Sequence, residues 1–267
     1  MNILIIGGGN MGITYAKAFI NSHVVTRSQL MILEKTIGKT DELKSLNVGE
    51  VYNEAGDCVS KADLIILAVK PQDFMQLSES MAKAVNKNQV FLSIMAGVKI
   101  STIKKALNID KVIRSMPNLP AQIGQGMTAF TATDAVTRHE QALVQNLLST
   151  TGKTLYVEKE DLLNAVTAVS GSGPAYVYYF MDAMVNTAMQ MGFNKSESEL
   201  LVMQTFSGAM SLYQQSELNC KEWIEKVASK GGTTEAALRS FSENKIDERI
   251  GAGVNKALDR AVELGKS

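Results

Sequence analysis

The chain has 267 residues, which at roughly 150 residues per domain predicts about two domains. Hydrophobic residues make up 45% of the chain and charged residues 20%, a balance that excludes an intrinsically disordered protein. The 27 basic residues are matched by 27 acidic ones, so no overall charge favours nucleic acid or an anionic membrane as a partner. We therefore expect a small-molecule partner.

Cysteine, histidine and hydropathy patterns exclude several further classes. Cys58 and Cys220 lie far apart, which argues against a disulfide framework and fits a reducing compartment. His23 and His139 have no second His or Cys at ligand spacing, so we expect no metal site. The N-terminus lacks a signal-peptide pattern, and apolar runs such as Leu64–Val69 are too short to span a bilayer. These features predict a cytoplasmic protein that uses neither membrane nor nucleic acid.

Short apolar runs alternate with helical stretches through the first part of the chain. The predicted strands are Asn2–Ile6, Leu30–Leu33, Leu64–Val69, Val90–Ile94 and Val112–Arg114, with Met127–Phe130 and Thr154–Val157 as further candidates. Strands separated by helices indicate a parallel sheet. We predict an α/β domain with a doubly wound parallel sheet over residues 1–160.

The rest of the chain, residues 161–267, is predicted to be an all-helical domain. All four prolines occur at or before Pro174. Beyond it, apolar residues recur at helical spacing over Tyr176–Met191, Leu200–Tyr213, Trp223–Ala228 and Ile250–Leu264, which indicates a bundle of about five helices. Many of the 14 methionines lie here, and we interpret them as filling a core or subunit interface rather than a cofactor pocket.

A glycine-rich loop follows the first strand directly. Gly7, Gly9 and Gly12 satisfy the GxGxxG pattern, and a helical stretch begins at Ile13. In this setting the first glycine permits a tight turn, the second lets the backbone approach a pyrophosphate, and the third allows close helix packing. The motif predicts a Rossmann-type dinucleotide-binding domain.

The end of the second strand leaves the choice of nucleotide open. Glu34 stands where a carboxylate accepts hydrogen bonds from the adenosine ribose and repels a 2′-phosphate, which favours NAD(H). Lys35 and Thr36 follow at once and suit a 2′-phosphate if the Glu34 side chain turns away, although Lys35 can equally be a solvated strand end. These residues are therefore compatible with either NAD(H) or NADP(H) as the cofactor.

Three further strand ends are expected at the same edge of the sheet. Ala68-Val69-Lys70-Pro71, Met95-Ala96-Gly97 and Met116-Pro117-Asn118 each follow a predicted strand. Ligands of such sheets bind beyond the carboxyl ends of the strands. We expect these segments to form the rim of the nicotinamide site.

Two motifs mark the helical part. Ser170-Gly171-Ser172-Gly173-Pro174 opens the long helix, either as a plain helix start or as a point of close ligand approach. Ser229–Thr234, with the sequence SKGGTT, precedes a helical stretch from Glu235. Unpaired amides at such a start suit a carboxylate, here on Gly232 and Thr233, with the Ser229 and Thr234 hydroxyls free for a second group, although a plain capped turn is an equal alternative.

The helical part of the chain offers no evident general base, which limits the reactions that we expect. Alcohol oxidation needs a positioned base, yet the helical part has no histidine, and Asp182 is the only charge over Ala175–Met191. Reduction of a cyclic iminium avoids this requirement, because the nitrogen already carries its proton. Orientation and a hydroxyl near that nitrogen are then sufficient.

With these motifs in order, the chain resembles the pyrroline-5-carboxylate reductases over nearly its whole length. The matching segments are GGGNMG, AVKP, MAGV, MPNLP, Glu158–Leu163, SGSGPAY and SKGGTT. The resemblance implies reduction of 1-pyrroline-5-carboxylate to L-proline, usually with NADPH, and a homodimer through the C-terminal helices that can assemble into larger rings.

The resemblance also implies roles for individual residues. Thr234, helped by Ser229, would hydrogen-bond the ring nitrogen, the segment Gly231–Thr233 would hold the substrate carboxylate, and Glu160 would border that pocket. The implied cofactor contacts, including those already derived, are Gly7, Gly9, Asn10, Met11, Gly12, Glu34, Lys35, Asn53, Ala68, Val69, Lys70, Ala96 and Asn118.

The chain departs from the family pattern at two positions. Lys230 stands where the family commonly has proline, and Glu34 is an acid where the family usually has none. A reductase of another cyclic imine or of a hydroxyacid, and a non-catalytic accessory protein of the same family, are the alternative functions. The missing base weighs against the hydroxyacid, and the intact GGTT and SGSGPAY segments weigh against the accessory protein.

Overall fold

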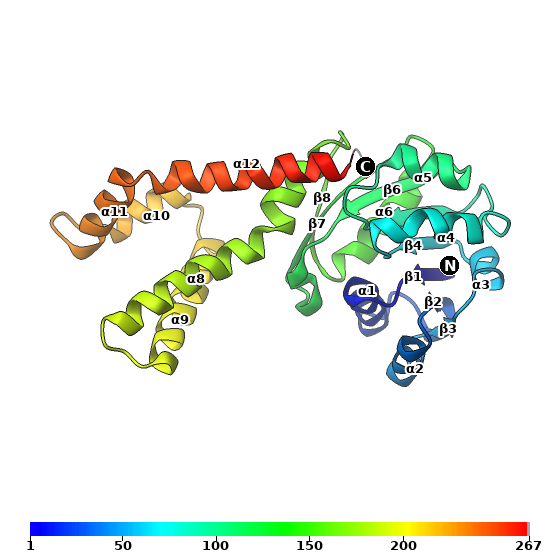
Figure 1. Cartoon of the computed structure of the whole chain (residues 1–267), viewed down its shortest axis with the longest axis horizontal. Helices are drawn as coiled ribbons and strands as arrows, with labels where there is room; N and C mark the ends of the chain where they lie inside the picture. Colours follow the sequence, from blue (N-terminus) through cyan, green and yellow to red (C-terminus); the bar gives the residue numbers. More distant parts are fainter. Residues whose placement is uncertain (266–267) are drawn as a thin grey trace. The chain divides into compact units, whose positions relative to one another are not determined.

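The computed structural model describes residues 1–265, and the chain divides into two compact units. The first unit contains Met1–Ser172 together with the end of the chain from Ala257, and the second contains Gly173–Lys256. Figure 1 traces both units in sequence colours, with the sheet drawn in blue to green.

The first unit is built on one sheet, which has eight strands within residues 1–265. The strands are β1 (Ile3–Ile6), β2 (Leu30–Leu33), β3 (Glu50–Tyr52), β4 (Leu64–Leu67), β5 (Val90–Ser93), β6 (Val112–Met116), β7 (Gly126–Ala132) and β8 (Gly152–Tyr156). Their order across the sheet is β3-β2-β1-β4-β5-β6-β7-β8. All neighbours are parallel except β6 and β7. The order reverses beside β1, as expected for a doubly wound Rossmann-type sheet, so the predicted fold class is confirmed.

Helices cover both faces of this sheet. They are α1 (Asn10–Asn21), α2 (Ile37–Leu46), α3 (Asp57–Lys61), α4 (Phe74–Met81), α5 (Ile100–Leu107), α6 (Arg138–Ser149) and α7 (Leu162–Val166). One face packs Tyr15 and Phe19 of α1 and Leu147 of α6 into a core with Ile3 and Ile5. The other face packs residues of α3, α4 and α5 against Leu4 and Ile6. Because side chains alternate along a strand, β1 is buried on both sides, which explains its unbroken apolar sequence.

Two features of the sheet differ from the sequence prediction. The three-residue strand β3 (Glu50–Tyr52) was not predicted, because it is short, lies at the sheet edge and contains no buried residue. The strand β7 runs antiparallel to β6, since the chain returns beside it without a crossover helix. The two candidate strands around Met127 and Thr154 are present as β7 and β8.

The boundary between the units lies later than the expected one between residues 160 and 161. Leu163 of α7 is fully buried against Ala129 and Val157, so α7 packs with the sheet unit. A π-helical turn over Thr167–Gly171 then leads to the first residues of the helical unit. At the other end, the chain from Ala257 belongs again to the sheet unit, with Ala261 buried.

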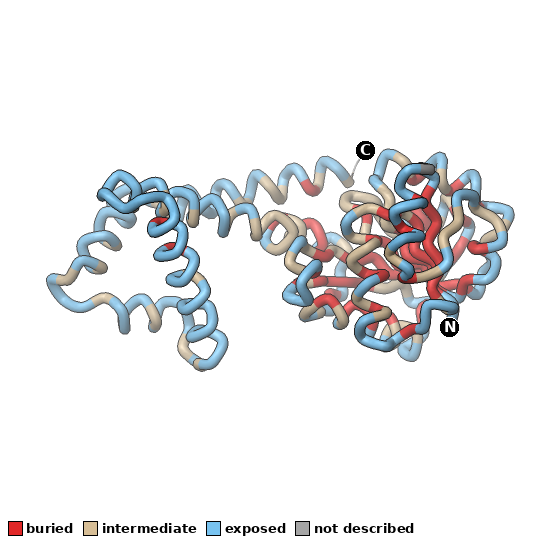
Figure 2. The backbone as a smooth tube through the Cα atoms, turned by 90° about the horizontal axis from the view of Figure 1, so that it is seen from below, coloured by how far each residue is buried: buried red, intermediate tan, exposed pale blue. Residues whose placement is uncertain are grey.

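The helical unit consists of α8 (Gly173–Gln190), α9 (Lys195–Gln214), α10 (Cys220–Val227), α11 (Thr233–Glu243) and the first part of α12 (Ile246–Leu264). Among the described residues of this unit, Ser198 and Val202 are the buried ones. Figure 2 shows the contrast, with red confined mostly to the sheet unit. Within the described chain, no helix combines the length and apolarity needed to cross a membrane.

Candidate functional site

A cavity of about 480 Å³ lies at the carboxyl ends of β1, β2 and β4. Eight residues predicted from sequence to bind the cofactor line it: Gly7, Gly9, Glu34, Lys35, Asn53, Ala68, Val69 and Lys70. The cavity is therefore at the edge of the sheet, and beside the strand-order reversal, where dinucleotides bind in this fold.

The glycine loop leaves room for a ligand above Gly9. Gly7 adopts a φ of +110°, and a β-carbon there would lie 2.6 Å from the carbonyl oxygen of Ala68. A β-carbon on Gly12 would collide with the carbonyl oxygen of Gly7, so the start of α1 packs closely on the loop. A β-carbon on Gly9, by contrast, would have no heavy atom within 4 Å. The open space over Gly9 and the amides at the start of α1 fit a pyrophosphate.

Glu34 is held by two main-chain amides. Its side chain accepts hydrogen bonds from the N–H of Gly8 at 3.0 Å and from that of Thr36 at 2.9 Å, and the residue is 8% exposed. Burial alone would raise the pKa of this carboxyl, but the bonds from Thr36 and Gly8 and the charge of Lys39 outweigh it and lower the pKa. Glu34 thus ties the glycine loop to the segment after β2.

Cationic and hydroxyl groups line the same end of the cavity. Lys35, Thr36 and Lys39 are exposed there, and the ammonium group of Lys35 lies 4.0 Å from the carboxylate of Asp73. Sequence reasoning missed Lys39, although its place in the first turn of α2, directly after β2, was a usable signal. Together these residues can hold an anionic group beside Glu34.

The remaining predicted cofactor residues do not line this cavity. Met11 and Gly12 lie within α1, and Asn10 at its start faces a second cavity of about 520 Å³ between α1 and the turn Leu119–Ile123. Ala96 follows β5.

The side-chain carboxamide of Asn118 forms hydrogen bonds within the sheet unit. It accepts a bond from the N–H of Met127 at 2.8 Å and donates to the carbonyl and hydroxyl oxygens of Ser170, each at 3.2 Å. Its role in the structure is to join β6 and β7 to the π-helical turn.

Glu160 takes part in a largely buried ion pair. Its carboxylate lies 2.8 Å from the guanidinium group of Arg114, whose side chain is 5% exposed, and accepts the N–H of Ile100 at the start of α5, also at 2.8 Å. The structure therefore joins three segments through Glu160. Its predicted contact with the substrate stays a prediction.

The loop before α11 carries the predicted substrate residues. The N–H of Gly232 donates to the carbonyl of Ser229 at 3.0 Å, and that of Gly231 donates to the carboxylate of Glu235. Within residues 1–265, the N–H groups of Thr233 and Thr234 form no hydrogen bond. Of the two predicted donors, the N–H of Thr233 is free and that of Gly232 is not, because Gly232 closes the turn onto Ser229.

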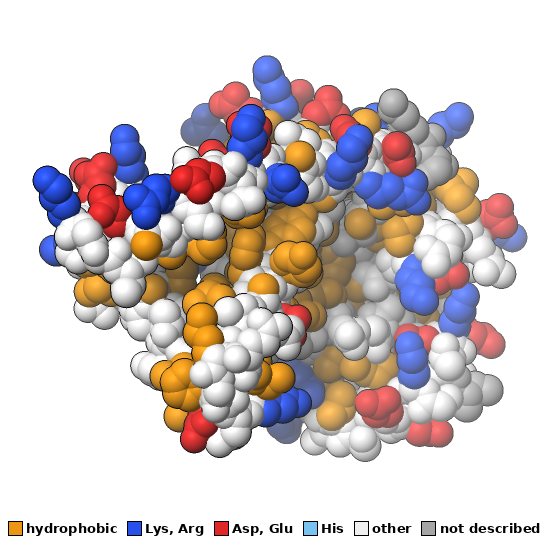
Figure 3. Space-filling model, turned by 60° about the vertical axis from the view of Figure 1, so that its left-hand side comes forward, with side chains coloured by type: hydrophobic (Ala, Val, Ile, Leu, Met, Phe, Trp, Pro, Cys, Tyr) orange, Lys and Arg blue, Asp and Glu red, His pale blue; other side chains and the backbone are white. Residues whose placement is uncertain are grey.

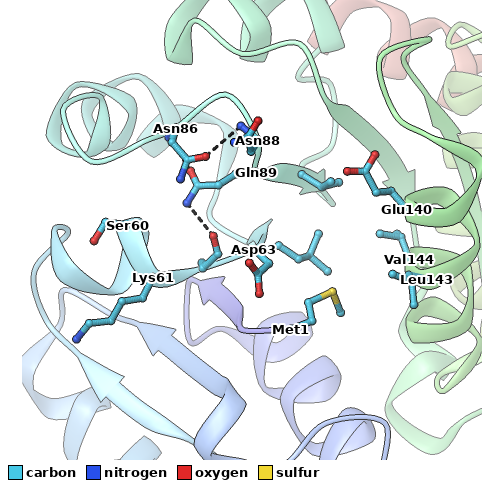
Figure 4. A pocket seen from close by; sticks show the side chains of 13 residues that line it. Met1, Ser60, Lys61, Asp63, Asn86, Asn88, Gln89, Glu140, Leu143 and Val144 are labelled. Carbon is cyan, nitrogen blue, oxygen red and sulfur yellow. Dashed lines mark hydrogen bonds between the residues drawn. The ribbon is translucent and has the colours of Figure 1, made fainter.

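Another polar cavity, of about 420 Å³, lies at the opposite edge of the sheet, where β4 and β5 begin. Asn86, Asn88 and Gln89 gather on one side of it and Glu140 on the other (Figure 4). The Gln89 carboxamide is buried and bonds to the carbonyls of Val59 and Ala62 and to the N–H of Asn86. These polar groups hold the end of α3, and no predicted site residue of the cofactor or substrate lies here.

Comparisons with known proteins match both parts of the chain. Residues 160–264 match the family described as pyrroline-5-carboxylate reductase dimerisation, and residues 2–97 match the family described as NADP oxidoreductase, coenzyme F420-dependent. A pyrroline-5-carboxylate reductase of Pseudomonas aeruginosa is 31% identical over 99% of this chain and 97% of its own length. The enzyme of the same name from Vibrio alginolyticus is 36% identical over 78% of this chain and 77% of its own.

Solved structures agree in fold over the full length. A pyrroline-5-carboxylate reductase from Coxiella burnetii superposes with a TM-score of 0.92 at 29% identity, covering 100% of this chain and 99% of that one. The 1-pyrroline-5-carboxylate reductase from Streptococcus pyogenes gives a TM-score of 0.86 at 28% identity and covers 98% of both chains. The resemblance predicted from the motifs is confirmed, and the chain belongs to the pyrroline-5-carboxylate reductase family.

Proposed function

We propose that this protein reduces 1-pyrroline-5-carboxylate to L-proline with a nicotinamide dinucleotide. The observation that carries the proposal is the start of α11, where the three successive main-chain N–H groups of Thr233, Thr234 and Glu235 have no partner within the described chain. The full-length similarity to reductases of that name supports the same substrate. When bound, the cofactor supplies the hydride that adds to the carbon of the C=N bond.

The residues before and within α11 bind and orient the substrate in this proposal. The N–H groups of Thr233 and Thr234 hold the carboxylate at the positive end of the helix dipole, while Gly231 and Gly232 shape the loop. The Thr234 hydroxyl, helped by that of Ser229, hydrogen-bonds the ring nitrogen. The nitrogen already carries a proton in the iminium form, so these residues need to orient the ring and do not need to remove a proton.

The test of function follows the disappearance of reduced cofactor. The purified chain is mixed with 1-pyrroline-5-carboxylate, with 1-pyrroline, which lacks the carboxylate, and with the six-membered cyclic imine carboxylate. We expect turnover that requires both the carboxylate and the five-membered ring. Preference for the six-membered ring would indicate another cyclic-imine reductase, and cofactor binding without any turnover would indicate an accessory protein.

NADPH is the proposed cofactor, and the surroundings of Glu34 support it. The Glu34 carboxylate is drawn towards two main-chain amides, while Lys35, Thr36 and Lys39 line the cavity beside it. These three groups suit a 2′-phosphate. The match of residues 2–97 to NADP oxidoreductases points the same way.

Cofactor choice is tested with two lysines of α2. Lys39→Gln is expected to raise the KM for NADPH by about tenfold and to leave the KM for NADH within about twofold, because one charge-assisted bond is lost. Lys44→Gln, later on the same helix and away from the cavity, is the control. A wild-type preference for NADH, with Lys39→Gln behaving like Lys44→Gln, would instead assign Glu34 to the ribose.

A homodimer through the helical unit is part of the proposal. Large apolar side chains lie exposed on this unit, including Tyr179 at 74%, Met191 at 75% and Leu200 at 61%. Figure 3 shows such side chains in orange at its surface. A unit with this little buried core needs a partner to cover its apolar faces. Light scattering after size-exclusion chromatography gives the number of subunits, and a larger ring would appear as a multiple of the dimer.

A further inference from the structure

The loop between β5 and α5 is in close contact with the last turn of α12. Gly97 in this loop has a φ of +77°, and a β-carbon on it would lie 2.8 Å from the carbonyl oxygen of Leu264 and 3.0 Å from its carbonyl carbon. A β-carbon on Gly265 would lie 3.4 Å from the carbonyl oxygen of Gly97. The backbone of the loop at Gly97 therefore lies directly against the backbone of the last turn of α12. Gly97 has no room for a side chain without a shift of the other segment.

The same loop is anchored at both of its ends. Met95, two residues after β5, is 2% exposed and donates its N–H to the hydroxyl of Ser93. At the other end, the N–H of Ile100 donates to the carboxylate of Glu160. The contact with Leu264 thus supports the middle of a loop whose ends are already held.

The end of α12 is a packed part of the sheet unit. Ala261 is 5% exposed, and the chain from Ala257 belongs to the same compact unit as the loop. The first part of α12, up to Lys256, belongs to the helical unit that also carries Ser229–Thr234. One continuous helix therefore begins in the unit of the proposed substrate loop and ends on the loop that contains Ala96.

We propose that the last turn of α12 is a positioning element for the nicotinamide site: it fixes the β5–α5 loop at Gly97, and so holds Ala96 where it meets the cofactor. The inference rests on the proposed function, which puts Ala96 against the nicotinamide half. A loop displaced by several tenths of an ångström would present Ala96 wrongly, and both cofactor affinity and hydride transfer would suffer.

A double-mutant cycle tests the contact. The four proteins are the wild type, Gly97→Ala, a chain ending at Glu263, and the combination of both changes. Gly124→Ala is the matched control, since Gly124 has a φ of +71° but no atom within 4 Å of an added β-carbon. The cofactor Kd is measured by the fluorescence of bound NADPH without substrate, alongside the thermal unfolding midpoint and the kcat for 1-pyrroline-5-carboxylate.

We expect Gly97→Ala to raise the Kd and lower kcat, each on the order of tenfold, while Gly124→Ala stays within about twofold of the wild type. In the chain ending at Glu263, the further effect of Gly97→Ala should shrink to that of the control, because the clashing carbonyl has gone. Equal effects of the two glycine substitutions would overturn the inference, as would full additivity in the cycle. A lowered unfolding midpoint with unchanged Kd and kcat would also overturn it, since the contact would then serve stability alone.

The two proposals fail in distinguishable ways. A wild type that binds NADPH but does not turn over 1-pyrroline-5-carboxylate would refute the proposed function, while the Kd cycle would still report on the loop. A wild type that turns over normally, with no coupling between Gly97 and the last turn of α12, would refute the positioning role alone.

Discussion

Glu34→Gln is the sharpest test of the architecture of the proposed cofactor cavity. Glutamine keeps the size of the side chain, but it replaces one acceptor oxygen with an NH2 group. In the native chain both carboxylate oxygens accept a main-chain N–H, one from Gly8 and one from Thr36. The substitution therefore removes the negative charge and sets a donor against a donor on one side.

The magnitude follows from the bonds that are lost. A hydrogen bond to a charged group contributes roughly 1.5–3 kcal/mol, so losing one and leaving a buried amide without its partner should cost about 2 kcal/mol. For a chain of this length, 1 kcal/mol corresponds to about 2–4 °C in the unfolding midpoint. We expect the midpoint of the sheet unit to fall by about 4–8 °C at pH 7.

The pH dependence gives a second, independent signature. The pKa of Glu34 is lowered in the folded protein, so its stabilisation is present above the ordinary value of 4.5 and is lost as the pH falls through the folded-state pKa. The stability difference between wild type and Glu34→Gln should therefore be constant from pH 7 to pH 5 and shrink below about pH 4.5. Urea unfolding followed by circular dichroism at several pH values measures it.

The matched control is Glu79→Gln. Glu79 is exposed on α4, and within residues 1–265 its side chain forms neither an ion pair nor a hydrogen bond. This variant should unfold within about 0.5 kcal/mol of the wild type. If Glu34→Gln were equally harmless, or if its effect did not change with pH, the two amide contacts would not hold the glycine loop as argued.

Three further predictions concern the other contacts. Thr234→Ala should lower kcat/KM by about 100-fold with an unchanged NADPH Kd, because the hydroxyl oxygen that accepts a hydrogen bond from the protonated ring nitrogen is lost. Thr234→Ser should restore most of the activity, and normal turnover of the alanine variant in steady-state assays would refute the role. Arg114→Met should cost about 3 kcal/mol in urea unfolding, because it leaves the Glu160 carboxylate without its cation, and a neutral effect would show that the pair contributes little. Tyr179→Asp should shift the protein to monomer in light scattering, since it puts a charge on an exposed apolar face of α8, and an unchanged mass would exclude this face from the interface.

Local patterns in the sequence predicted most of the fold. Apolar runs indicated β1, β2, β4, β5 and β6, and the Gly7–Gly12 spacing indicated the turn into α1, which the structure contains. These features depend on neighbouring residues, because strand and helix periodicity and glycine's conformational freedom act over a few positions. The short edge strand Glu50–Tyr52 has no such pattern, because its residues are not buried.

Part of the lining of the proposed cofactor cavity was likewise predictable. Eight of the expected residues line it, because the carboxyl ends of parallel strands must meet at one edge of the sheet. The hydrogen-bond and ion-pair partners of the individual side chains were not predictable from the sequence. Glu34 bonds to Gly8 and Thr36, and Glu160 bonds to Arg114, because the fold brings these groups within reach.

The contact between the last turn of α12 and Gly97 also separates what the sequence predicts from what only the tertiary structure shows. The glycine and the final helix are both visible in the sequence, but nothing local relates residue 97 to residue 264. Only the tertiary structure brings the two backbones together, since the packing of the last turns of α12, from Ala257, within the sheet unit depends on contacts between segments far apart in the chain. The sequence by itself thus determined the elements and the family, and the tertiary structure decided which elements support the site.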